Sequence, residues 1–440
     1  MRLVVAPISQ MRKTILFLIL LAAAYPVFAQ PPGMSQGEYV ARLGNCVACH
    51  TTPNGEPFAG GVAMEAPNLG IIYGTNITPH PETGIGNYSF EDFDKAVRIG
   101  ITPDGRHLYP AMPYPSYAKT TEEDMLAMYD YFMNEVEPIN QPNPINEIPG
   151  WKSARWPLAI WNMMFVPTTA YQPDPQQSDE WNRGAYLVQG LGHCGACHTP
   201  RGLMFQEKAL DQSGDAYLAG APLDHWSASS LRGDLAYGLG RWTEEDIVQL
   251  LAEGRNRWGP TFGTMVEVVN NSTQYMTDYD LAAMTLYLKS LSAVAGDSAN
   301  QPYVHNSADT GLLLSGSLAS HPGAQVYFEN CMNCHGYDGL GHPPYIPPVA
   351  GNTAVLDPDP SSIINLTLNS SLRLVIGEQP TLYDMPFYRE QLSNQEIADA
   401  LSFIRQAWGN AAPGITALQV DQIRQATDPV NEDVHILRMK

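Results

Sequence analysis

The chain has 440 residues, of which 44% are hydrophobic and 16% charged, with 36 Pro and 37 Gly. This length exceeds one ordinary core and predicts about three domains, in a globular protein with long loops. The formal net charge of −21 argues against nucleic acid as a partner, because phosphate binding needs clustered Lys and Arg.

The first 29 residues form a predicted signal peptide. Arg12 and Lys13 precede an apolar run over 15–24, and Val27-Phe28-Ala29 places small residues where a signal peptidase cleaves. The run is shorter than the roughly 20 residues that span a bilayer. Either Met1 or Met11 is the translation start. We therefore expect an exported protein that, by itself, is soluble or peripheral to a membrane.

All six cysteines stand in three copies of the pattern Cys-x-x-Cys-His, at 46–50, 194–198 and 331–335. Export permits disulfides, but a bridge between cysteines three apart closes only a very small loop. A redox Cys-x-x-Cys normally occurs once, on a βαβ pattern that is absent here. Structural zinc needs four ligands, whereas each copy provides three.

The remaining interpretation is covalent attachment of haem c, for which this pattern is the signature. Two intervening residues place both sulfurs on one side of a helical turn, where each can bond one vinyl group of the same porphyrin. The adjacent histidine then binds the iron from its proximal face. The sequence predicts three haem c groups, one per copy, held by Cys46, Cys49 and His50; Cys194, Cys197 and His198; and Cys331, Cys334 and His335.

The residues around each copy repeat as well, which predicts one small helical unit in triplicate. A first helix before the cysteines contains a glycine, a second helix ends at a glycine, and a final helix begins at Ser or Thr with an acid three residues later. The glycine of the first helix allows the final helix to cross closely. In chain order these residues are Gly37, Gly100, Thr121 and Asp124; Gly184, Gly254, Thr277 and Asp280; and Gly323, Gly377, Ser393 and Glu396.

The predicted fold is therefore mostly α: three tandem small cytochrome c domains, each a few helices around one covalent haem c, with long loops. The predicted segments are 30–136 for the first domain, 137–179 for a Pro- and aromatic-rich linker, 180–295 for the second domain, 296–318 for another linker, 319–410 for the third domain and 411–440 for a tail with weak helical pattern. Trp151, Trp156 and Trp161 in the first linker either pack between two domains, which Pro157 favours, or insert into a membrane interface.

Methionines are the predicted distal ligands of the three irons. Counted from the glycine that ends the second helix, Met112 lies 12 residues on, Met265 lies 11 on and Met385 lies 8 on. Met276 is the rival in the second domain, but it lies 22 residues past Gly254. Alternatives are that these methionines fill cores, or that a histidine binds instead: His80, His107, His193, His225 or His342.

A hydrogen bond should also orient each proximal histidine. Each should donate its other ring N–H to a backbone carbonyl, with Pro53, Pro200 and either Pro347 or Pro348 as candidates. A thioether on the other side of the iron favours the ferrous state and raises the reduction potential. With both axial positions filled, no iron has an open site for a substrate, which argues for transfer of single electrons.

Longer strings resemble a known family. TNITPHPETGIGNYSFEDFDKAVRIG at 75–100, DGRHLYPAMPYPSY at 104–117, NRGAYLVQGLGHCGACHTPRG at 182–202 and FGTMVEVVNNSTQYMTDYDLAAMTLYLKSL at 262–291 are similar to the triple-haem cytochrome c subunit of bacterial membrane-bound alcohol, gluconate, sorbitol and aldehyde dehydrogenases. The resemblance places the family's ligand on Met265. MEAPNLGIIYG at 64–74 differs from the shorter loop that it implies.

The resemblance implies a role between two partners. In the periplasm, the cytochrome would take electrons from a separate catalytic dehydrogenase subunit, with a quinone, flavin or molybdenum cofactor. It would pass them to ubiquinone or a terminal oxidase, in peripheral association with the periplasmic face of the inner membrane. The chain has no nucleotide-binding fingerprint, P-loop or nucleophile elbow, so we expect no catalytic site of its own. The alternatives are a peroxidase-like haem enzyme with one open iron and a free-standing periplasmic carrier.

Overall fold

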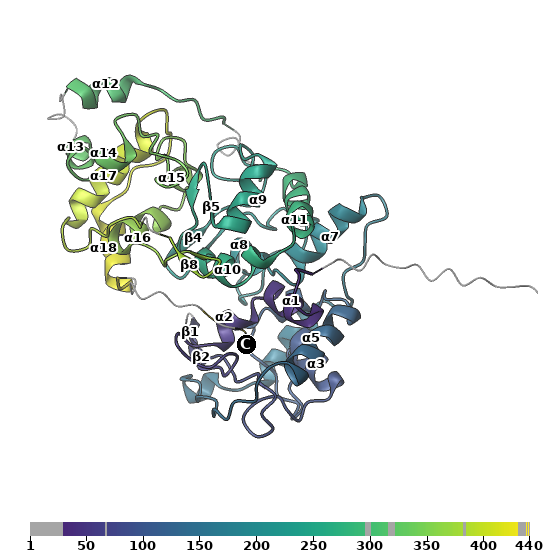
Figure 1. The fold of residues 1–440 in the computed structure, drawn as a ribbon. Helices are drawn as coiled ribbons and strands as arrows, with labels where there is room; N and C mark the ends of the chain where they lie inside the picture. The colour runs from purple at the N-terminus through teal and green to yellow at the C-terminus, as the bar shows by residue number, and fades with distance from the viewer. Residues whose placement is uncertain are drawn as a thin grey trace, which may run out of the picture.

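The computed structural model describes residues 30–66, 68–294, 301–315, 322–381, 384–429, 437 and 439. The predicted signal peptide and both candidate start methionines lie outside the described residues. The described chain is mostly helical, with four antiparallel two-stranded hairpins and no larger sheet (Figure 1). None of its helices is long and apolar enough to cross a membrane.

One helix pair occurs three times and frames the fold. The first member of each pair is α1 (Gln36–Leu43), α7 (Asp179–Gln189) or α13 (Pro322–Asn330), and the second is α5 (Glu122–Asn134), α11 (Asp278–Ser290) or α17 (Asn394–Gln406). Each pair crosses at the predicted glycine. A Cβ added to Gly37, Gly184 or Gly323 would overlap the carbonyl oxygen of Ala127, Ala283 or Asp399, respectively, on the second helix. The close crossing inferred from the sequence is therefore confirmed in all three places.

Two of the predicted middle helices are present, and the third prediction is wrong. Helices α3 (Phe90–Ile99) and α9 (Glu244–Glu253) end at Gly100 and Gly254, whose φ values are +63° and +66°. The helix predicted to end at Gly377 is instead a hairpin of β7 (Val375–Ile376) and β8 (Gln379–Pro380). Gly377 and Glu378 both have positive φ, as a two-residue hairpin turn requires, and β-branched Val375 and Ile376 suit strands. The third middle helix is α16 (Ser361–Asn369), which ends eight residues earlier.

The remaining elements are short. The other hairpins pair β1 (Ala63–Ala66) with β2 (Gly70–Tyr73), β3 (Ala221–Leu223) with β4 (Trp226–Ala228), and β5 (Arg255–Asn256) with β6 (Gly259–Pro260). The other helices are α2 (Cys46–His50), α4 (Tyr114–Tyr117), α6 (Trp156–Phe165), α8 (Gly195–His198), α10 (Met265–Asn271), α12 (Ala308–Ser315), α14 (Met332–His335), α15 (Thr353–Leu356), α18 (Ala417–Ala426) and the 3₁₀ turns η1 (Gly150–Lys152) and η2 (Thr273–Tyr275). The string 64–74 that departs from the family thus contributes to the β1–β2 hairpin.

The buried side chains do not form three separate cores. One cluster contains Tyr39 and Met125 from the first helix pair together with Leu187 and Met284 from the second. A second cluster surrounds the third pair. Val266 and Val269 of α10 form a small separate patch with Leu374, the residue before β7. Figure 1 shows α1, α5, α7 and α11 gathered together, with α13 and α17 at the far end of the molecule. The first two helix pairs consequently share one hydrophobic core.

Two reciprocal hydrogen bonds cross this shared core. Tyr39 on α1 donates to Asp280 of α11 at 2.7 Å, and Tyr186 on α7 donates to Asp124 of α5 at 2.6 Å. Asp124 and Asp280 occupy the third positions of their helices, where the sequence predicted capping boxes. Their carboxylates bind the other pair's tyrosine, whereas only Glu396 on α17 completes its predicted capping box with Ser393.

The segment predicted as a linker, 137–179, is bound at several points to residues of the first predicted domain. The side-chain amide of Asn76 donates to the carbonyl oxygens of Ile139 and Gln141, and Glu147 pairs with Ile71 of β2. Trp161 on α6 is buried, but Trp151 and Trp156 are 81% and 71% exposed. The prediction that these tryptophans pack between domains therefore holds for Trp161 and is wrong for the other two.

Replacing Gly184 by valine should destabilise the shared core. The added side chain would meet the backbone of Ala283, which cannot move without separating α7 from α11. We expect a loss of at least about 2 kcal/mol in the free energy of unfolding, measured by denaturant titration followed by circular dichroism.

The matched control is Gly311→Ala, inside helix α12, where an added Cβ meets nothing within 4 Å. It should leave stability unchanged or raise it by up to about 1 kcal/mol. Equal effects of the two substitutions would contradict the close-crossing argument.

Candidate functional site

The three Cys-x-x-Cys-His patterns fold into single helical turns, α2, α8 and α14, directly after the first helix of each pair. None of the six cysteines is in a disulfide. Burial raises the pKa of the Cys46, Cys194 and Cys331 thiols to about 12 and that of Cys49 and Cys197 to about 11. Thiols this basic remain protonated at neutral pH. The described residues also contain no cluster of three or more His, Cys, Asp and Glu side chains suited to a metal ion.

Each motif histidine is held by the same kind of hydrogen bond. Nδ1 of His50 lies 2.6 Å from the carbonyl oxygen of Thr75, Nδ1 of His198 lies 2.7 Å from that of Ser229, and Nδ1 of His335 lies 3.0 Å from that of Pro347. Burial lowers the pKa of all three imidazoles. A neutral ring that donates from Nδ1 keeps its lone pair on Nε2, which is the state that binds iron.

The predicted carbonyl partners were partly wrong. Pro347 holds His335 as expected, but Thr75 and Ser229 replace Pro53 and Pro200. These acceptors lie 25 and 31 residues from their histidines, where the chain returns after a long loop. No local pattern in the sequence marks such a return, so sequence analysis had no signal for them.

One cavity of about 1090 Å³ unites most of the predicted residues. Its lining includes Cys194, Cys197, His198 and Met265 from the second set and Cys331, Cys334, His335 and Met385 from the third. From the first set it includes only Cys49, while Cys46, His50 and Met112 lie outside it. The volume exceeds the roughly 300–1,000 Å³ of an ordinary single-ligand pocket. The structure thus brings the second and third sets into one space, with the first set at its edge.

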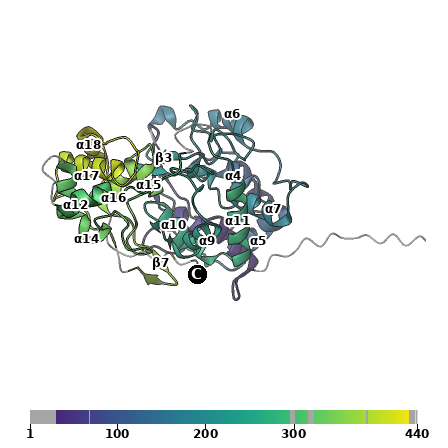
Figure 2. The ribbon, with the colours of Figure 1, turned by 90° about the horizontal axis from the view of Figure 1, so that it is seen from above.

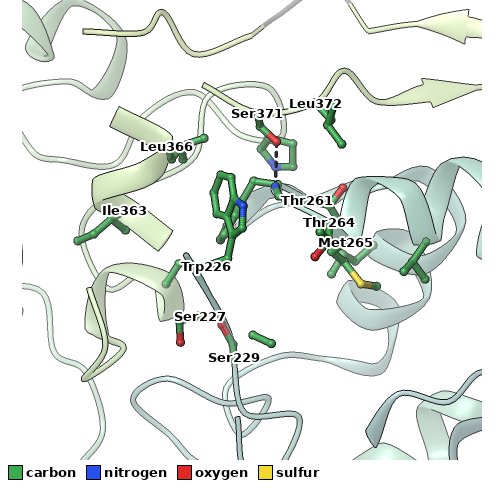
Figure 3. Close-up of a pocket in the computed structure, with 18 of the residues that line it drawn as sticks. Trp226, Ser227, Ser229, Thr261, Thr264, Met265, Ile363, Leu366, Ser371 and Leu372 are labelled. Atoms are coloured by element: carbon green, nitrogen blue, oxygen red, sulfur yellow. Dashed lines mark hydrogen bonds between the residues drawn. The ribbon is translucent and has the colours of Figure 1, made fainter. Parts of the chain in front are cut away.

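Trp226 lines this cavity where the second and third units meet, and sequence analysis missed it. Figure 3 shows its indole between Ile363 and Leu366 of α16 on one side and Thr261 and Met265 on the other. Because α16 belongs to the third unit and Met265 to the second, this side chain lies at the boundary between the two parts of the cavity. Its place depends on tertiary structure and has no motif.

The three chosen methionines share a spacing that the sequence did not reveal. Met112 lies five residues after His107, which pairs with Ile101. Met265 and Met385 lie five residues after Pro260 and Pro380, the last residues of β6 and β8. The spacing of eight residues from Gly377 to Met385 has no structural meaning, because no helix ends at Gly377. Counted from the second residue of each pairing, all three methionines lie at the same distance along the chain. Met276 breaks this register, although it also lines the cavity.

The third unit is joined to the second beside the histidine-holding strand. The backbone N–H of Ser227 on β4 donates to Oγ of Ser362 at 2.8 Å, and the hydroxyl of Ser227 donates to Asp357 at 3.0 Å. Ser229, whose carbonyl holds His198, follows one residue after β4. Contact with the third unit therefore supports the segment that orients the second histidine. Burial raises the pKa of Asp357 to about 6.

Paired cysteines that precede a neutral, hydrogen-bonded histidine beside a mostly apolar cavity fit haem c, and define a c-type cytochrome. Residues 320–408 match the family described as Cytochrome c. The chain is 48% identical to the cytochrome c subunit of a quinone alcohol dehydrogenase from Gluconacetobacter polyoxogenes, over 90% of this chain and 85% of that one.

Other relatives agree. The cytochrome c subunit of gluconate 2-dehydrogenase from Pantoea cypripedii is 45% identical over 94% of this chain and 96% of its own length. The fructose dehydrogenase cytochrome subunit from Gluconobacter japonicus is 36% identical over 91% and 84%. The chain belongs to the family of cytochrome c subunits of bacterial dehydrogenase complexes, as its sequence motifs predicted.

Asp357→Asn should remove a pH-dependent contribution to stability. The folded state raises the pKa of this carboxyl from its ordinary value near 4 to about 6, so ionisation between these pH values is disfavoured in the folded state. Parent stability should consequently fall as pH rises from 4 to 7, by about 2 kcal/mol relative to the variant. Urea unfolding at several pH values measures the difference.

The exposed carboxylate of Asp130 provides the control. The Asp130→Asn variant should follow the pH dependence of the parent protein. If Asp357→Asn also follows the parent across this window, ionisation of Asp357 does not affect stability.

Proposed function

We propose that this chain is a periplasmic triple-haem cytochrome c that relays single electrons from a catalytic dehydrogenase subunit to ubiquinone or a terminal oxidase at the membrane. It would comprise three tandem cytochrome c domains, after removal of the signal peptide at 1–29. The observation that carries the proposal is the threefold occurrence of a Cys-x-x-Cys-His turn whose histidine is neutral and held through Nδ1 by a backbone carbonyl.

The residues that would hold each haem c follow from this repeat. Thioether bonds would come from Cys46 and Cys49, Cys194 and Cys197, and Cys331 and Cys334, with His50, His198 and His335 as proximal ligands and Met112, Met265 and Met385 as distal ligands. When bound, haem c accepts and releases one electron at its iron. The protein holds the imidazoles neutral and supplies an apolar lining, which tunes the potential.

The shape of the cavity favours a relay over three independent carriers. Its lining contains the second and third predicted sites together, and the side chain of Trp226 lies between α16 and Met265 within it. The common core of the first two helix pairs fixes the first site relative to the second, and Cys49 of the first site borders the cavity. Transfer between sites does not require diffusion when their positions are fixed in this way.

The relatives support the choice of donor. They are cytochrome subunits of alcohol, gluconate and fructose dehydrogenases, so we propose a separate catalytic subunit as donor, with a quinone, flavin or molybdenum cofactor. Delivery to ubiquinone or an oxidase places the chain at the periplasmic face of the inner membrane, in peripheral association. The chain itself would carry no catalytic site for the organic substrate.

The haem count of the purified holoprotein tests the proposal directly. A pyridine haemochrome assay should give three haems per chain, and Cys194→Ala with Cys197→Ala should give two. The double variant should also slow reduction of the acceptor by the dehydrogenase complex by at least about tenfold, because the relay loses its central site. Three haems in the double variant would refute the motif assignment.

Substitution of methionines in the second unit tests the distal ligand. Met265→Ala should remove one share of the weak red absorption band of methionine–ferric coordination and lower the potential of one haem. Met276→Ala is the matched control, because its side chain lines the same cavity, and it should leave both signals unchanged. The reverse result would transfer the ligand role to Met276. Rapid carbon monoxide binding by the parent protein would instead favour a haem enzyme with an open iron.

A further inference from the structure

Helix α6 is apolar at every position except Asn162. It contains no charged residue, and its buried side is formed by Trp161 and Asn162. The opposite side presents Trp156, Ile160 and Met163, which are 71%, 46% and 79% exposed. These three positions follow the spacing i, i+4, i+7 and form one stripe. A helix that is apolar all round is normally buried, yet α6 lies at the outer edge of the molecule (Figure 2).

An exposed turn with apolar side chains lies beside this stripe. Arg201 and Glu207 pair across a tight turn whose tip contains Leu203 and Phe205, 102% and 51% exposed. Tight turns at a surface normally use Gly, Pro, Asn, Asp or Ser. The indole N–H of Trp161 donates to the carbonyl oxygen of Met204 at 2.9 Å, so the turn and α6 are parts of one surface. We call this surface, formed by α6 and residues 202–206, the apolar face.

The charge around the apolar face differs from that of the whole chain. The chain contains 45 Asp and Glu, but none occurs from residue 148 to 173 or from 181 to 206. Basic residues are present instead: Lys152 and Arg155 precede α6, and Arg201 begins the turn. Glu207 is 4% exposed and lies 3.8 Å from Arg201. A strongly acidic protein thus keeps one surface that anionic phosphates would not repel.

We propose that the apolar face docks on an anionic phospholipid bilayer, with Trp156, Ile160, Met163 and Leu203 in the headgroup and upper acyl region and Lys152, Arg155 and Arg201 near lipid phosphates. Interfacial helices combine these features: an apolar stripe, a tryptophan at interface depth and basic neighbours. A protein partner fits less well, because the exposed stripe offers a single hydrogen-bonding group, the indole N–H of Trp156, whereas protein interfaces typically contain about ten hydrogen bonds.

Docking here would fix which predicted haem sites lie close to the lipid. Asn162 of α6 donates to the carbonyl oxygen of Ile99 at 2.6 Å and accepts from Tyr114 at 2.9 Å. These bonds attach α6 to the segment that carries Met112, while the turn at 202–206 follows directly after His198. The inference rests on the proposed membrane location and specifies it: the first and second sites face the bilayer, and the third is remote.

Flotation with lipid vesicles tests the proposal on the full holoprotein. Vesicles of phosphatidylethanolamine and phosphatidylglycerol should carry the parent protein, more strongly at low salt, and pure phosphatidylcholine vesicles should carry less. Trp156→Glu with Met163→Glu should reduce partitioning by at least about tenfold. Val304→Glu with Leu418→Glu is the control, because these side chains are 72% and 65% exposed away from the apolar face, and it should bind like the parent.

Two further readouts separate this inference from the proposed function. Haem content and electron uptake from the dehydrogenase subunit, measured with a water-soluble acceptor, should be equal in parent and variants. Parent-like flotation of the Trp156/Met163 variant would overturn the proposal, as would loss of the dehydrogenase subunit from that variant with vesicle binding retained, which would mark a protein interface. Should that variant lose haem, Leu203→Asp at the fully exposed tip replaces it, and unchanged flotation of Leu203→Asp would overturn the proposal equally.

Discussion

Two buried tyrosine–carboxylate hydrogen bonds hold the first two helix pairs in one orientation. Tyr39 of the first pair binds Asp280 of the second, and Tyr186 of the second pair binds Asp124 of the first. The two contacts are therefore related to one another like those across an isologous dimer interface. Hydrogen bonds to carboxylates are roughly twice as strong as neutral ones. Each carboxylate also has a partner within its own helix pair: Arg183 binds Asp280 at 2.8 Å and Gln36 donates to Asp124 at 3.2 Å. Burial also raises the pKa of both phenols, so they stay protonated as donors. The positions of the first two Cys-x-x-Cys-His turns depend on these bonds.

The third unit is attached differently. Its first helix has Gln325 where the other two have tyrosine, two residues after the crossing glycine, and its buried cluster is separate. It contacts the second unit through the small apolar patch around Leu374 and through hydrogen bonds, among them those that Ser227 donates to Ser362 and Asp357. Fewer buried apolar contacts give a less stable connection. The same chain repeat therefore produces one rigid two-unit body and one unit that docks on the strand supporting His198.

Residue type and local spacing predicted much of the fold. The features that sequence analysis missed depend on contacts between residues far apart in the chain. The cysteine motifs, the crossing glycines and the helix ends at Gly100 and Gly254 follow from residue type and spacing alone. The error at Gly377 arose because a glycine with positive φ ends a helix or turns a hairpin equally well. The carbonyl partners of the histidines, the tyrosine–carboxylate exchange and Trp226 depend on residues tens of positions apart, which no local pattern encodes.

The uneven distribution of charge would help to orient the apolar face toward the bilayer. A net charge of −21 would repel the chain from a negatively charged leaflet, and this repulsion acts within about 8 Å at physiological salt. A surface without acids reduces this repulsion only where contact occurs, so the charge that keeps the rest of the protein soluble also disfavours other orientations on the bilayer. Orientation matters for an electron carrier because transfer to a lipid-soluble acceptor requires one haem to be held near the membrane. The asymmetry of charge, together with an apolar helix that packs directly on the segment bearing Met112, would therefore select the end of the relay from which electrons leave.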